Sequence, residues 1–139
     1  MSSMTYQATP RFSQRQHHQI TTATFVVLFW AVAALAVCGT HRVLDAASWQ
    51  TSFAVKVGAI VVAGYAYIRF TARDATLHHG LGVGVMWLLF AIIAEVAIGA
   101  AGGTQWTVLL GAPSRPFLRN VMLFIWITAP ALFARRRYE

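Results

Sequence analysis

Four long apolar runs constrain the fold of this chain more than any other feature of its sequence. They cover residues 20–38, 51–70, 80–101 and 117–133. A helix needs about 20 residues, within a range of about 17–25, to cross a hydrocarbon core of about 30 Å. All four runs reach this range, the last one only just. Lipid offers no partner to a bare backbone amide, so we expect each run to be a helix. The alternating segments of about 10 residues that are typical of a membrane β-barrel do not occur.

The runs predict an all-α, polytopic membrane protein whose four transmembrane helices form one up-down-up-down bundle. Composition agrees, because the chain is 58% hydrophobic and only 11% charged, against about 25% charged in an average soluble domain. We divide the 139 residues into a cytoplasmic N-terminal tail (1–19), a transmembrane domain (20–134) and a basic C-terminal tail (135–139).

The arginines predict how the bundle is oriented. Both tails and the connection after the second run would lie on one side of the membrane, and they carry seven bases; the opposite side carries three. Cytoplasmic segments are enriched in Lys and Arg. We therefore expect both termini in the cytoplasm, with the protein in the inner (plasma) membrane. The seven bases are Arg11, Arg15, Arg69, Arg73, Arg135, Arg136 and Arg137.

The first run admits a second interpretation as a cleaved signal peptide. Basic residues precede it, and the stretch LAVCG places Cys38 where a lipoprotein would be acylated. However, Val37 occupies a position that small residues fill in such sites, and the run is long for a signal peptide. We expect it to remain a span, with Cys38 as a free thiol.

The connection before the fourth run differs from the other two, because it is longer and contains an apolar piece of its own. Residues 106–110 read WTVLL, between breaks made by Gly and Pro. We expect this piece to lie in the outer interface; the alternative is a re-entrant, pore-lining loop. Pro116 should begin the last helix, where its missing N–H costs nothing, and Pro130 should bend it.

Glu95 is an acid inside an otherwise apolar run, and the pattern around it predicts that it faces the bundle. One arc of this helix carries small residues and the acid, and the opposite arc is bulky (Met86, Leu89, Phe90, Ile93 and Ala97). Small residues mark close helix contacts inside membranes. The predicted helix-packing face comprises Gly80, Gly84, Ala91 and Gly99 with Ala59 and Ala63 of the second run.

A buried charge is costly without a partner, and Lys56 of the second run lies at about the same depth as Glu95. We predict an intramembrane ion pair between Lys56 and Glu95, with Arg119 as a further candidate partner. The pair would act either as a structural clamp or in transport and proton handling. Lys56 also lies shallow enough to extend outward to the interface.

Two histidine pairs are weak candidates for ligands: His17 and His18 before the first run, and His78 and His79 at the start of the third. Histidines from different helices can hold a metal or a haem. Adjacent histidines on one helix point about 100° apart, so each pair offers one convenient ligand. We interpret them as interfacial polar residues, and we predict no metal and no cofactor.

The sequence contains no catalytic constellation, so we do not expect an enzyme. Its bases lie in short clusters between apolar runs and not in a helical stripe, which argues against nucleic acid. We expect a protein that acts through helix contacts, as an accessory subunit of a membrane complex or as a homo-oligomer. Its partners would be the lipid bilayer and a protein or a second copy. Alternatives are a small oligomeric transporter or channel that uses Glu95 and, more weakly supported, a haem-bearing electron-transfer subunit.

Overall fold

The computed structural model describes residues 11–44, 48–102, 109–110 and 114–134, without the side chains of 11–20 and 41–42. This described part is all-helical. It contains four helices: α1 (Arg11–Val43), α2 (Trp49–Thr71), α3 (Leu77–Gly102) and α4 (Pro116–Leu132). The C-terminal tail (135–139) and residues 1–10 of the N-terminal tail lie outside it, whereas residues 11–19 belong to α1.

Three of the described helices are long and apolar enough to cross a membrane. They are α2, α3 and the Thr21–Thr40 part of α1. The fourth, α4, is apolar but has only 17 residues, or about 26 Å at 1.5 Å per residue. The prediction of an all-helical chain with membrane-length apolar helices is confirmed at this level, and the chain is compatible with a membrane location.

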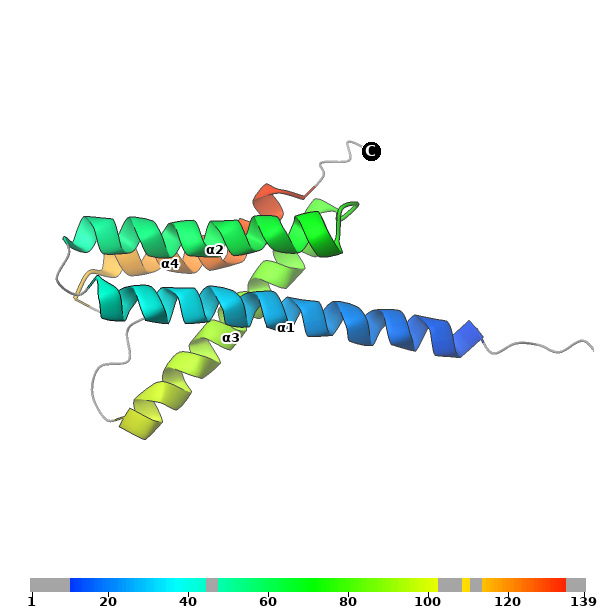
Figure 1. Ribbon diagram of the computed structural model, residues 1–139, viewed down its shortest axis with the longest axis horizontal. Helices are drawn as coiled ribbons and strands as arrows, with labels where there is room; N and C mark the ends of the chain where they lie inside the picture. The colour runs from blue at the N-terminus through cyan, green and yellow to red at the C-terminus, as the bar shows by residue number, and fades with distance from the viewer. Residues whose placement is uncertain (1–10, 45–47, 103–108, 111–113, 135–139) are drawn as a thin grey trace, which may run out of the picture.

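Local sequence explains where these helices begin. The Ser48 side chain caps α2 by accepting the Thr51 N–H, which satisfies one of the donors left free at a helix start. Pro116 begins α4, as predicted. Helix α1 begins well before the apolar run, at Arg11, and its N-terminal part projects beyond the other helices (Figure 1). Its polar first turns contain Arg and Gln, which favour helix without needing lipid.

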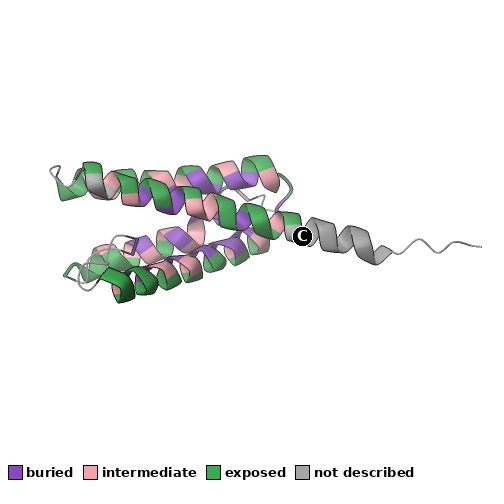
Figure 2. Cartoon of the chain, turned by 60° about the horizontal axis from the view of Figure 1, so that its bottom comes forward, coloured by how far each residue is buried: buried purple, intermediate pink, exposed green. Residues whose placement is uncertain are grey.

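The helices form two layers, one of α1 and α2 and one of α3 and α4, as Figures 1 and 2 show. Contacts are most extensive within each layer. The layers are joined mainly where α2 packs on α4, and more sparsely where α1 meets α3. Buried residues lie on the sides of the helices that face one another, and exposed residues lie on the outside (Figure 2).

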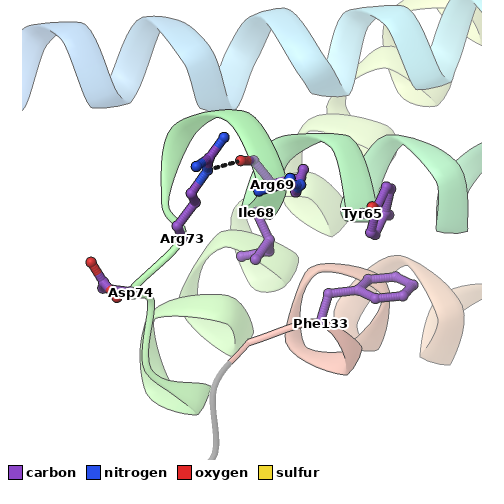
Figure 3. A pocket seen from close by; sticks show the side chains of 6 residues that line it. All are labelled: Tyr65, Ile68, Arg69, Arg73, Asp74 and Phe133. Atoms are coloured by element: carbon purple, nitrogen blue, oxygen red, sulfur yellow. Dashed lines mark hydrogen bonds between the residues drawn. The ribbon is translucent and has the colours of Figure 1, made fainter.

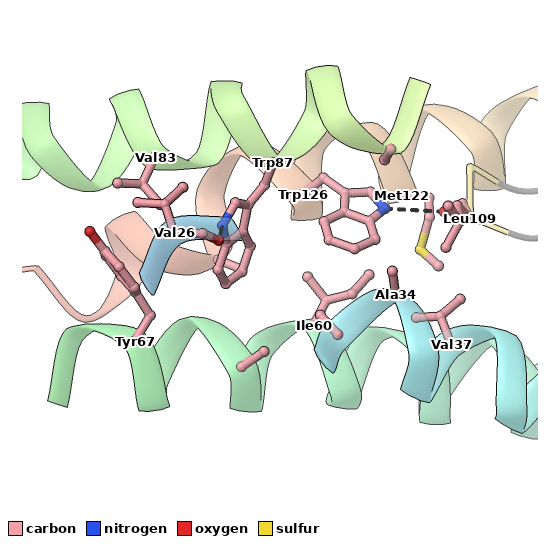
Figure 4. Packing of buried hydrophobic residues seen from close by; sticks show 14 of the residues in the cluster. Val26, Ala34, Val37, Ile60, Tyr67, Val83, Trp87, Leu109, Met122 and Trp126 are labelled. Carbon is pink, nitrogen blue, oxygen red and sulfur yellow. Dashed lines mark hydrogen bonds between the residues drawn. The ribbon is translucent and has the colours of Figure 1, made fainter. Parts of the chain in front are cut away.

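Three large aromatic side chains occupy the centre of the bundle: Tyr67 of α2, Trp87 of α3 and Trp126 of α4 (Figure 4). None is accessible to solvent. Neighbouring rings meet edge to face, with centroids 6.2 Å apart for Tyr67–Trp87 and 6.3 Å for Trp87–Trp126. Aromatic pairs prefer this arrangement, so the rings fill the space between the layers in favourable contacts.

The outward side of α3 agrees with the predicted bulky arc, with one exception. Met86, Leu89 and Ile93 are exposed. Phe90, which we expected on the same side, is half-buried because its ring packs edge to face against Trp30 of α1, at 5.5 Å between centroids. Helix α1 therefore covers part of the side that the pattern of α3 assigned to lipid.

Glycines allow α2 and α3 to approach the backbone of α4 closely at three points. A Cβ added at Gly84 of α3 would overlap the backbone carbonyl of Ile127, and one at Gly80 would lie 2.8 Å from the Ala131 Cα. A Cβ on Gly64 of α2 would lie 2.8 Å from the Ala129 carbonyl. At these points helix backbones touch directly, as small residues permit in membrane bundles.

Candidate functional site

Glu95 is the one charged residue among the buried residues of the described part, with 3% of its surface exposed. It projects from the second half of α3 into the bundle. Its Oε1 accepts a hydrogen bond from the backbone N–H of Leu110 at 3.4 Å. Its Oε2 is buried and has no hydrogen-bond partner. A buried polar atom without a partner is costly, so this oxygen marks an unusual point in the core.

The residues that meet Glu95 belong to the connection between α3 and α4. Leu109 and Leu110 are 2% and 5% exposed, and they lie against the helices. The Leu109 carbonyl accepts a hydrogen bond of 3.1 Å from Trp126 Nε1, shown as a dashed line in Figure 4. Glu95 and Trp126 thus hold this short segment from two sides, one by its amide and the other by its carbonyl.

For Leu109 and Leu110, this arrangement corrects the expectation that the apolar piece of residues 106–110 lies in the outer interface. Leu109 and Leu110 are buried inside the bundle, and residues 106–108 lie outside the described residues. A loop can be buried only when its backbone groups find partners. Side chains on α3 and α4 supply those partners here, which a reading of the connection by itself did not reveal.

Two cations act on the Glu95 carboxylate through their charge: Arg119 of α4 and, more weakly, Lys56 of α2. The positions of Glu95 and Arg119 along their helices agree with such an interaction. Gly84 of α3 contacts Ile127 of α4 where these two helices cross. If the helices run in opposite directions, Glu95, which lies eleven residues further along α3, is level with about the start of α4. Arg119 is exposed and Lys56 is half-buried. The ion pair of these residues stays a prediction, because the contacts described for the carboxylate are with backbone amides.

The predicted helix-packing residues divide into two groups. Gly80, Gly84, Ala91 and Ala63 are buried, whereas Gly99 and Ala59 are half-buried. Gly80 and Gly84 lie against α4 of the same chain. Their small surfaces are therefore used inside this fold, so a partner would have to meet other faces of the bundle.

The opposite end of the core contains a second polar contact, between Tyr67 and His79. The Tyr67 hydroxyl and His79 Nε2 are 3.0 Å apart and hydrogen-bonded, and the two rings are nearly parallel. His78 is exposed. Among the side chains that the structure describes, no three His, Cys, Asp or Glu groups come together to hold a metal. The side chains of His17 and His18 lie outside that part.

The indole N–H of Trp87 also forms a hydrogen bond within the aromatic core. Its Nε1 donates to the backbone carbonyl of Val26 at 3.0 Å, between α3 and α1. Trp30 differs, since its Nε1 is buried without a partner. Sequence analysis could place the tryptophans within helices, but it could not identify backbone carbonyls on other helices as their acceptors.

Comparison with protein-family models, with curated proteins and with solved structures found no match to this chain. Its function is therefore argued from the geometry of its own residues.

Proposed function

We propose that this chain is a small, non-catalytic integral membrane protein that acts through contacts of its outer helix faces. It would serve as an accessory subunit of an inner-membrane complex or assemble with copies of itself. The proposal includes four transmembrane helices, running up-down-up-down, with both termini in the cytoplasm.

The packing of the centre is the observation that carries this proposal. Tyr67, Trp87 and Trp126 meet ring to ring with no exposed surface. A substrate path through one copy of the bundle would have to displace them, and close-packed protein interiors resist such changes. The outer helix faces are then where the molecule can meet another protein.

Contact pairs along the helices support alternating directions. From α1 to α3, Val26 meets Trp87 and Trp30 meets Phe90, so the paired residues advance together. From α3 to α4 the order reverses, since Gly80 meets Ala131 and Gly84 meets Ile127.

Helices α2 and α4 advance together again. Arg115 lies over the Trp49 ring at 4.6 Å where both helices begin, and Tyr65 meets Phe133 near the end of both. This order brings α4 alongside a membrane-length neighbour, which favours α4 as a fourth span despite its 17 residues. Tryptophan at a helix start is typical of a membrane boundary.

In this proposal Glu95 is a structural residue: its carboxylate fixes the Leu109–Leu110 segment between the helices. One observation favours a second function, a small oligomeric transporter or channel. Glu95 Oε2 has no hydrogen-bond partner, and an intramembrane acid of this kind is a candidate for binding a proton or a cation.

Two measurements on the purified full chain separate these functions. Light scattering in detergent should give a fixed multiple of the chain mass, or a fixed stoichiometry with one co-purified protein; a lone monomer contradicts the first proposal. Proteoliposomes carrying a proton or sodium gradient should leak no faster than empty vesicles. Flux that Glu95→Gln abolishes, and that the exposed α3 control Val96→Leu retains, would establish the transporter instead.

A further inference from the structure

A surface pocket of about 480 Å³ lies at the end of the bundle where α2 and α4 finish (Figure 3). It is formed by the last turns of α2, the turn that follows it and the first residue after α4. The pocket is separate from Glu95, which belongs to the other end of α3. Its lining residues are Tyr65, Ile68, Arg69, Arg73, Asp74 and Phe133.

One wall of the pocket is apolar. The rings of Tyr65 and Phe133 meet edge to face with 5.3 Å between centroids, which links α2 to the end of α4. Ile68 is buried behind them. Tyr65 and Phe133 themselves remain partly exposed, so they present an apolar surface on the side of the pocket nearer the middle of the bundle.

The other wall is charged and lies beyond the last apolar turns. Arg69 and Arg73 stand one helical turn apart, and Arg73 Nε donates to the Arg69 carbonyl at 2.9 Å (Figure 3). This bond fixes the Arg73 side chain beside Arg69 through its Nε and does not use its terminal N–H groups. Guanidinium groups bind phosphate oxygens through such donors.

Asp74 adds a selective element. The pocket carries two cationic side chains and one acidic one, which gives a formal net charge of +1 (two minus one). Carboxylate oxygens also accept hydrogen bonds from hydroxyl groups, such as those of a glycerol headgroup.

The pocket also lies at the depth that a lipid headgroup would occupy. Helix α2, which is long and apolar enough to cross a membrane, ends at Thr71, between the two arginines. Basic pockets at the ends of membrane helices bind anionic headgroups. A ligand that fits both walls is apolar at one end and anionic at the other.

We propose that this pocket binds the headgroup of an anionic membrane phospholipid, of the phosphatidylglycerol class. Arg69 and Arg73 bind the phosphodiester, Tyr65 and Phe133 contact the upper part of the acyl chains, and Asp74 accepts from headgroup hydroxyls. The inference rests on the proposed membrane location, and it is independent of whether the chain acts alone, with copies or with a partner.

Native mass spectrometry of the full chain released from detergent micelles tests the proposal. Equal concentrations of phosphatidylglycerol and phosphatidylcholine are added, and bound lipid is counted. We expect the wild-type chain to retain one phosphatidylglycerol, with about tenfold preference over phosphatidylcholine, because phosphatidylcholine carries a quaternary ammonium beside its phosphodiester and the two guanidinium groups repel that positive charge. The double variant Arg69→Gln/Arg73→Gln should lose most of this preference and keep only the part that the headgroup hydroxyls contribute through Asp74.

The matched control is Arg115→Gln, which removes an exposed arginine at the opposite end of the bundle and should keep the preference. If the double variant does not fold, as judged by circular dichroism, Arg69→Gln alone serves, with a loss of about threefold. Equal binding of both lipids by wild type, or an unchanged preference in the variants, overturns the proposal. So does displacement of the lipid by millimolar inorganic phosphate, which would identify a soluble phosphate as the ligand.

Discussion

The two halves of α3 are held in the bundle by opposite means. In the first half, Gly80 and Gly84 carry no side chain, and the backbone of α4 occupies the space that a Cβ would need. In the second half, Glu95 reaches out and binds the backbone of a connecting segment. The first contact depends on the absence of atoms and the second on one particular atom. A single helix can therefore be sensitive to added volume at one end and to hydrogen-bonding capacity at the other.

Both means suit a membrane bundle. Lipid tails are as apolar as leucine, so burying apolar side chains gains little there, and close packing and hydrogen bonds between helices have to stabilise the fold. Around α3 the two contributions are spatially separated, which makes them separable by substitution.

Adding one methyl group at Gly84 is expected to have the largest effect. The new Cβ would overlap the Ile127 carbonyl, so α3 and α4 must move apart over several turns. We expect Gly84→Ala to lower the free energy of unfolding by about 3 kcal/mol, at the upper end of the usual cost of overpacking. Denaturation in mixed micelles, followed by circular dichroism, measures this.

Gly82→Ala is the matched control two residues away. A Cβ there meets nothing within 4 Å, and Ala favours helix over Gly by about 1 kcal/mol. This variant should be as stable as wild type or slightly more stable. Equal destabilisation by both substitutions would contradict the role assigned to the close crossing.

At the other end of α3, the chemistry of residue 95 should matter more than its size. Glu95→Leu leaves the buried Leu110 N–H without an acceptor, whereas Glu95→Gln keeps an amide oxygen for it. Leaving a buried donor unpaired costs about 1–3 kcal/mol. We expect the Leu variant to be about 2 kcal/mol less stable than the Gln variant in the same denaturation experiment. A Leu variant as stable as the Gln variant would show that the hydrogen bond from the Leu110 N–H does not stabilise the fold.

A smaller effect is expected where the same segment is bound from α4. Trp126→Phe removes the donor to the Leu109 carbonyl and should cost about 1 kcal/mol for the lost hydrogen bond. Trp30→Phe is the control, because Trp30 Nε1 is buried without a partner and its loss sacrifices no hydrogen bond. Amide hydrogen exchange at Leu110 should accelerate in the Trp126 variant alone; acceleration in both, or in neither, would be evidence against the clamp.

The sequence predicted those features that depend on local pattern. Apolar run length predicted the helices, the arc of small residues indicated the side of α3 that carries Glu95, and the lack of a proline N–H predicted the start of α4 at Pro116. Each follows from residues within a few turns of one another, so periodicity and propensity suffice.

Features that depend on contacts between distant segments could not be predicted in this way. Phe90 is covered by Trp30, about sixty residues earlier in the chain, and Leu110 provides its amide to Glu95 from a stretch that we expected in the outer interface. The ion pair of Lys56 or Arg119 with the acid stays a prediction, and backbone amides carry no signature in the sequence that could identify them as partners of Glu95.

The crossing at Gly84 also has an evolutionary consequence. Because the contact on α4 is made by the main chain of Ile127, it restricts one position of the pair and leaves the other free to drift. Descendants of this gene should retain glycine at 84 while tolerating valine, leucine or methionine at 127. Such one-sided inheritance would be missed by any search for positions that change together.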